Sequence, residues 1–127
     1  MDQENNPNYS GAERRQYPRI KGDMAAYAFY PSGPFKEPAF IKDLSIGGAC
    51  LFISEHLGVD AILYLKIYIL GRDVAISAKS KVVWRSKADG PSTYYIGVQF
   101  LEVLPAEKEQ LSQYIAQQLK DGAAVKE

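Results

Sequence analysis

The sequence predicts an all-β fold with a C-terminal helix, arranged as a six-stranded antiparallel β-barrel. Six short segments rich in β-branched and aromatic residues are separated by turns that contain glycine or proline, a pattern typical of small barrels and sandwiches. After Pro105 the apolar residues recur at helical spacing instead. The 127 residues fit one domain that can bury its own core.

The first three strands are expected at residues 24–30, 39–44 and 49–53. The sequence Pro-Ser-Gly-Pro breaks the first strand and starts a loop, residues 31–38, before the second. Residues 45–48, with two glycines, predict a turn between the second and third strands.

The fourth strand, residues 61–70, shows the clearest alternation. One face carries Leu63, Leu65, Ile67 and Ile69, and the other carries Tyr64, Lys66 and Tyr68. The fifth strand spans 74–85, and its alternation slips at 80–83, which predicts a β-bulge. A hairpin loop at 88–92 leads to the sixth strand, 94–100.

A C-terminal helix is expected from Pro105 to Lys120. Its apolar side chains, Leu111, Tyr114, Ile115 and Leu119, share one face. This face must either cover a barrel opening or pair with another subunit, so a homodimer is one alternative. Residues 1–12 are polar and predict a flexible tail, and residues 121–127 predict a frayed end.

Composition disfavours several functional classes. Lys and Arg total 15 and Asp and Glu total 15, so overall charge indicates neither a nucleic-acid nor a membrane partner. No signal peptide or spanning segment is evident, and we expect a cytoplasmic location. Cys50 lies in an apolar run, which favours a buried side chain. His56 lies in a polar connection and is expected in solvent, so nothing indicates an enzyme or a metal site.

Two segments carry chemistry beyond the fold. The first is Arg14-Arg15-x-x-x-Arg19. Guanidinium groups bind phosphate through paired hydrogen bonds and stack on purine rings, but a solvated basic stretch is also a reasonable interpretation.

The second is Asp43-x-Ser45-x-x-Gly48. It can be a plain hairpin turn in which glycine supplies a positive φ. It can also be a binding loop, because a carboxylate accepts hydrogen bonds from a guanine edge, a hydroxyl donates and accepts, and glycine lets a ligand approach closely.

Taken together, the two segments resemble the PilZ domain family, whose signature is RRxxxR before the first strand and D/NxSxxG after the second. The segment Tyr95–Phe100 is also similar to the family's last barrel strand, which often reads Gly-Val-x-Phe. The resemblance covers roughly residues 13–119 and predicts a PilZ domain at residues 13–120. It implies a barrel with a C-terminal helix, in agreement with the strand pattern.

The resemblance implies a receptor for the second messenger cyclic di-GMP. Arg15 and Arg19 would then hold phosphates and guanines, Asp43 and Ser45 would read guanine edges, and Gly48 would give room.

Two further residues bear on the ligand. The family's pattern implies that an arginine at position 14 goes with two intercalated cyclic di-GMP molecules. Trp84 is expected either to pack in the core or to stack on a guanine.

We expect the arginine segment to become ordered over the ligand and the complex to signal to a separate effector protein, which the sequence does not identify. An alternative is a PilZ-like protein-interaction adaptor that does not bind nucleotide. A barrel that binds single-stranded nucleic acid is disfavoured, because the strands carry few cations.

Overall fold

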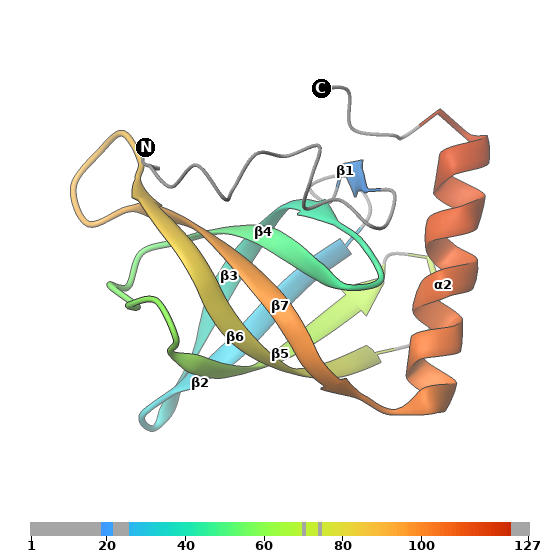
Figure 1. The fold of residues 1–127 in the computed structure, drawn as a ribbon, viewed down its shortest axis with the longest axis horizontal. Coiled ribbons are helices and arrows are strands. Elements are labelled where there is room, and N and C mark those ends of the chain that lie inside the picture. The colour runs from blue at the N-terminus through green and yellow to red at the C-terminus, as the bar shows by residue number, and fades with distance from the viewer. Residues whose placement is uncertain (1–18, 22–25, 70, 74, 123–127) are drawn as a thin grey trace.

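A computed structural model of the chain describes residues 19–21, 26–69, 71–73 and 75–122. It confirms the predicted closed antiparallel barrel with one C-terminal helix (Figure 1). The predicted tail, 1–12, lies outside the described residues, as does 123–127 of the predicted frayed end. The elements are β1 (Ile20–Lys21), β2 (Ala26–Ser32), β3 (Phe35–Leu44), β4 (Gly48–Ile53), β5 (Ile62–Ile69), β6 (Ala75–Lys87), β7 (Tyr94–Val103) and α2 (Pro105–Lys120).

The six longer strands form a ring in the order β3-β2-β5-β6-β7-β4, which closes where β4 pairs with β3. β1 adds two residues beside the end of β3, with Ile20 opposite Leu44 and Lys21 opposite Asp43. The sequence pattern did not predict β1 as a separate strand, because two residues carry no measurable alternation. This short strand brings the residue before it, Arg19, to the end of β3.

Strand alternation sets the core, as β5 shows. Leu63, Leu65, Ile67 and Ile69 are buried, whereas Tyr64 and Lys66 are exposed. The barrel interior is filled by side chains of this kind from every long strand, including Ile41, Leu51 and Ile96.

The predicted loop at 31–38 is wrong. β2 and β3 are joined by a tight turn at Gly33 and Pro34, and Gly33 has a φ of +59°. β3 therefore begins at Phe35 and includes Pro38, which lies opposite Phe29. Pro38 is tolerated because pairing of β3 with β4 starts only at Phe40, so the missing N–H costs no hydrogen bond to β4.

The predicted bulge in the fifth strand is confirmed, with Val83 as its extra residue, and a second irregularity has its extra residue, Leu101, on β7. The pairing of β6 with β7 shifts between Lys79 and Ser80 and again between Val82 and Trp84. After the second shift Trp84 lies opposite Gly97, whereas a regular ladder would place Trp84 opposite the buried Ile96. The bulge therefore directs the indole to the outer face of the barrel.

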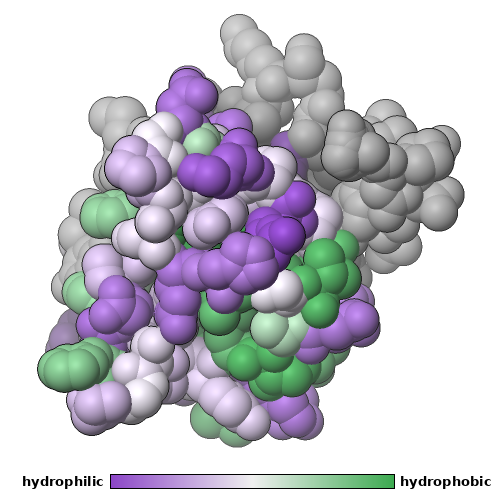
Figure 2. Space-filling model, turned by 90° about the vertical axis from the view of Figure 1, so that its left-hand side faces the viewer, coloured by the Kyte–Doolittle hydropathy of each residue, from purple (hydrophilic) through white to green (hydrophobic). Residues whose placement is uncertain are grey.

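The helix α2 confirms the predicted span and covers one end of the barrel (Figure 1). Its buried residues Leu111, Tyr114 and Ile115 join the core, and the Arg72 guanidinium lies 5.6 Å from the centre of the Tyr114 ring. In the described part of the chain, no helix is long and apolar enough to cross a membrane. Figure 2 shows the opposite end, where hydrophilic side chains surround an apolar patch.

Candidate ligand-binding site

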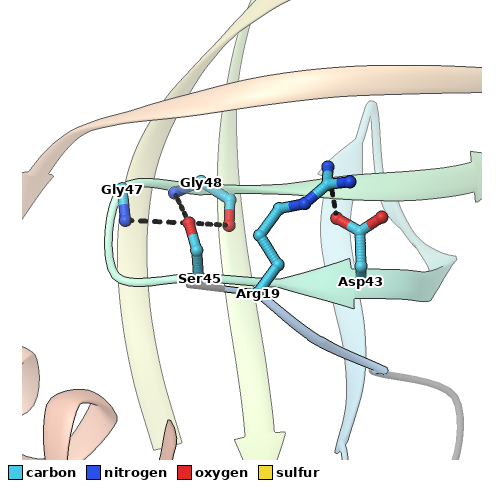
Figure 3. Close-up of polar contacts among 5 residues, drawn as sticks. All are labelled: Arg19, Asp43, Ser45, Gly47 and Gly48. Carbon is cyan, nitrogen blue, oxygen red and sulfur yellow. Dashed lines mark hydrogen bonds and ion pairs between the residues drawn. The ribbon is translucent and has the colours of Figure 1, made fainter. Parts of the chain in front are cut away.

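The site begins with an ion pair between two residues that are far apart in sequence. Arg19 Nη1 lies 3.2 Å from Asp43 Oδ1, and the two side chains are 22% and 8% exposed. Arg19 comes directly before β1, and the pairing of β1 with β3 places the arginine beside the aspartate (Figure 3). The structure thus brings together one residue from each of the two segments that the sequence indicated.

The Asp43 carboxyl is held in an unfavourable environment. Burial raises its pKa above the usual value, although Arg19, Lys42 and the backbone N–H of Cys50 each lower it. The oxygen Oδ1 accepts no hydrogen bond from the described residues, although it lies in the ion pair. A buried carboxylate oxygen that accepts no hydrogen bond would be stabilised by a bound molecule that donates one.

Ser45 uses its hydroxyl inside the turn. Its Oγ accepts hydrogen bonds from the backbone N–H groups of Gly47 (3.1 Å) and Gly48 (3.2 Å) and donates to the Gly48 carbonyl (3.3 Å) (Figure 3). The Ser45 N–H also donates to that carbonyl at 2.9 Å. Since a hydroxyl has one proton and two lone pairs, Ser45 is fully engaged in shaping the turn.

Gly48 is required by a neighbouring strand. A Cβ at this position would collide with the backbone carbonyl of Val98 on β7. Neither Gly47 nor Gly48 has a positive φ, so the expected left-handed glycine is not what closes this turn. The close approach of backbone, rather than conformational freedom, explains the glycine.

A series of cross-strand residue pairs connects Trp84 to Asp43 on the outer wall of the barrel. Trp84 lies opposite Gly97, Gly97 opposite Cys50, and Cys50 opposite Asp43. A Cβ on Gly97 would overlap the Trp84 indole ring. The half-buried indole therefore lies over Gly97 of β7, on the wall that carries the ion pair.

Cys50 is buried in this wall, as its sequence context predicted. Burial, and then the neighbouring Asp43 carboxylate, raises the pKa of the thiol to about 12, against the opposite effects of Lys42 and Arg19. The thiol is therefore neutral and unreactive at neutral pH.

The sequence that forms this barrel and its wall also matches a known protein family. A family model described as the PilZ domain matches residues 13–117. The chain belongs to the PilZ domain family. No curated protein sequence matches it.

Solved structures support the fold of this PilZ domain. The crystal structure of YcgR from Escherichia coli in complex with c-di-GMP superposes with a TM-score of 0.70 at 19% identity, covering 86% of this chain and 47% of YcgR. The PilZ domain of YcgR from Escherichia coli with c-di-GMP gives 0.67 at 21% identity, covering 87% and 94%. The Bacillus subtilis inhibitor of motility gives 0.69 at 20% identity, covering 84% and 52%. This PilZ domain thus spans about half the length of two of these proteins.

The structure gathers most of the residues predicted for the PilZ site. Arg19, Asp43, Ser45 and Gly48 lie around the end of β3, and Trp84 lies on the same wall. Arg14 and Arg15 lie outside the described residues. The sequence did not indicate the roles of Lys42, Cys50 and Gly97 in this wall, and the only signal for Gly97 was the Gly-Val-x-Phe pattern.

The expected solvent-exposed histidine is confirmed, and its contacts are with β6 and β7 rather than with the ion pair. Arg85 Nη1 contacts both ring nitrogens of His56, and the His56 ring meets Tyr94 edge-on. Within the described ranges, no group of three or more His, Cys, Asp or Glu side chains is placed to hold a metal ion.

Proposed function

We propose that this PilZ domain is a cyclic di-GMP receptor that passes the signal to a separate effector protein. The Arg19–Asp43 ion pair is the observation that carries the proposal. It places a guanidinium, which suits phosphate and purine faces, beside a carboxylate that suits the N–H groups of a guanine edge. The structures of YcgR that this chain resembles contain c-di-GMP, which supports the same ligand here.

The residues take different roles in the proposed site. Arg15 and Arg19 hold phosphates and stack on guanines, Asp43 accepts from a guanine edge, and the Trp84 indole offers an apolar flat surface beside them. Ser45 and Gly48 keep the turn in shape, and the bonding of Ser45 within the turn supports this role over direct contact. The proposed site is therefore half preformed on the barrel wall.

The remaining half comes from the segment before Arg19. We propose that binding orders this segment over the ligand and so changes the surface that an effector meets. Trypsin cleaves after arginine, so cleavage after Arg14 and Arg15 should slow when cyclic di-GMP is added. An unchanged cleavage rate at saturating ligand would contradict this ordering.

Calorimetric titration with cyclic di-GMP, with GTP and cyclic di-AMP as controls, tests the function itself. We expect binding of cyclic di-GMP alone, and loss of binding in Arg15→Ala. If the wild-type chain binds no cyclic di-GMP, the domain acts instead as an adaptor without nucleotide.

A further inference from the structure

A groove of about 290 Å³ lies on the outer face of β2, β5 and β6. We call it the β5 groove and define it by six of its lining residues, three aromatic and three basic: Phe29, Tyr64, Tyr68, Lys36, Lys66 and Lys79. None of these residues belongs to the wall that carries Arg19 and Asp43.

Alternation along β5 explains which of its side chains line the groove. Residues Tyr64, Lys66 and Tyr68 are the outward members of a strand whose inward members fill the core. The rings of Phe29 and Tyr68 meet edge to face at 6.2 Å, so together they form one side of the groove. Tyr64 is 59% exposed, so its ring is accessible to a partner.

The charged residues in the groove lining all have one sign. Its charged residues are Lys36, Lys66 and Lys79, and among the residues that the structure describes no Asp or Glu lines it. The Lys79 ammonium lies 3.8 Å from Glu102, whose side chain is 74% exposed, and such an exposed pair holds the lysine weakly. This local excess of positive charge contrasts with a chain that carries 15 basic and 15 acidic residues.

The groove and the candidate ligand site share no residue, although both use β3 and β6. On β3, Lys36 of the groove lies near the start of the strand and Asp43 near its end, and the groove is centred on β5, which is not paired with β3 or β4. Figure 1 shows β2 and β5 along the lower side of the barrel and β4 along the upper side. A molecule in the β5 groove would therefore not compete with one at the Arg19–Asp43 wall.

We propose that the β5 groove docks an acidic segment of a partner protein. A large apolar or aromatic side chain of the partner fills the groove between Phe29 and Tyr64, and its Asp or Glu residues pair with the lysine rim. The inference extends the proposed function by locating the effector contact, but the groove itself does not depend on which ligand binds.

A protein segment suits the groove better than single-stranded nucleic acid. Stacking of successive bases needs several flat ring faces along a positively charged track. Here the lysines surround one hollow, and the contact between Phe29 and Tyr68 turns one ring edge toward the other.

A selection from a random peptide library tests the proposal, with the full chain as bait. We expect enrichment of peptides that combine Asp or Glu with one aromatic or large aliphatic residue. The affinity of the best peptide should fall roughly tenfold or more in Lys66→Glu and in Tyr64→Ser, since reversal of a rim charge or loss of an anchoring ring costs about 1.4 kcal/mol or more. Lys108→Glu makes the same charge change at an exposed position on α2. It is the matched control and should bind the peptide as tightly as the wild type does.

Three results would overturn the proposal. They are enrichment of peptides without acidic residues, equal binding by Lys66→Glu, and preferential binding of a labelled oligothymidylate in this groove. Titration of Lys66→Glu with cyclic di-GMP separates the two proposals, because the ligand affinity should be unchanged. If cyclic di-GMP fails to bind while the selected peptide still requires Lys66, the function proposed above fails and the groove stands.

Discussion

At the scale of single residues, the Arg19–Asp43 pair should set a pH dependence. Arg19→Ala leaves a largely buried carboxylate without its cation, and we expect a loss of about 1–3 kcal/mol in the free energy of unfolding at neutral pH. Burial already raises the pKa of Asp43 above its unfolded value, and removal of Arg19 raises it further. The stability that comes from the protonated form is complete at low pH and is lost as pH rises through the folded-state pKa.

Urea unfolding of wild type and Arg19→Ala from acidic to neutral pH measures this effect. The difference between the two proteins should grow as pH rises. The double variant Arg19→Ala/Asp43→Asn should lose the pH dependence, because the amide does not titrate. A difference that stays constant with pH would show that the ion pair is not the cause.

Gly97 gives a second prediction at this scale. Gly97→Ala puts a methyl group where the Trp84 indole lies, so the ring must move, at a cost of about 1–3 kcal/mol of stability. Trp84 is the only tryptophan, and the emission spectrum should therefore report the displacement directly. If the indole forms part of the ligand site, affinity for cyclic di-GMP should fall as well.

Gly58→Ala is the matched control, since nothing lies within 4 Å of a Cβ at Gly58 and its φ is not positive. Its spectrum and stability should stay close to wild type. A Gly97→Ala protein with the wild-type spectrum would contradict the packing described here.

At the scale of elements, one polar contact should add to the docking of α2, which its buried apolar side chains already hold against the barrel. The Glu107 carboxylate accepts a 2.7 Å hydrogen bond from the backbone N–H of Ser77 on β6. Because this contact is exposed, Glu107→Ala should cost only about 1 kcal/mol in the free energy of unfolding. Glu109→Ala removes a neighbouring acid whose contact, to Gln113, stays within the helix, so its loss should be a few tenths of a kcal/mol. Equal losses in thermal or urea unfolding would argue against a docking role for Glu107.

The elements were predictable from the sequence where local periodicity decides them. β5 and α2 follow from alternation and from helical spacing, and the bulge in β6 follows from a break in the alternation. The start of β3 was missed because Pro38 reads as a breaker, and only the observed pairing shows that it precedes the contact with β4.

The candidate site was less predictable, since its roles depend on distant strands. The two segments indicate that Arg19 and Asp43 matter, but the turn role of Ser45 and the constraint on Gly48 depend on hydrogen bonds and on Val98 of β7. Likewise, the position of Trp84 over Gly97 depends on a register shift. Sequence spacing carries no information on such contacts.

At the scale of the whole molecule, stability should report the number of bound ligands. A ligand that binds only the folded state adds about 1.4 kcal/mol to the free energy of unfolding for each tenfold rise in its concentration above Kd, and two ligands add about 2.8 kcal/mol. If Arg14 supports a second cyclic di-GMP, the wild type should show the steeper dependence and Arg14→Ala the shallower one. Unfolding measured across ligand concentrations gives both slopes, and a shallow slope in wild type would rule out two molecules per chain.

The contact between Glu107 and Ser77 also bears on how the protein behaves at high concentration. A closed barrel offers no row of unpaired backbone groups to a neighbouring molecule. One short stretch of open edge in the described barrel is the start of β6, where residues 75–77 pair with β5 but precede the first residue that pairs with β7. At this short edge the Glu107 carboxylate of α2 accepts the hydrogen bond of the Ser77 N–H that a neighbouring strand would otherwise accept. If the helix undocked, this N–H would be free to pair with a strand of another molecule. Protection of this part of the barrel against intermolecular strand pairing therefore depends on the helix.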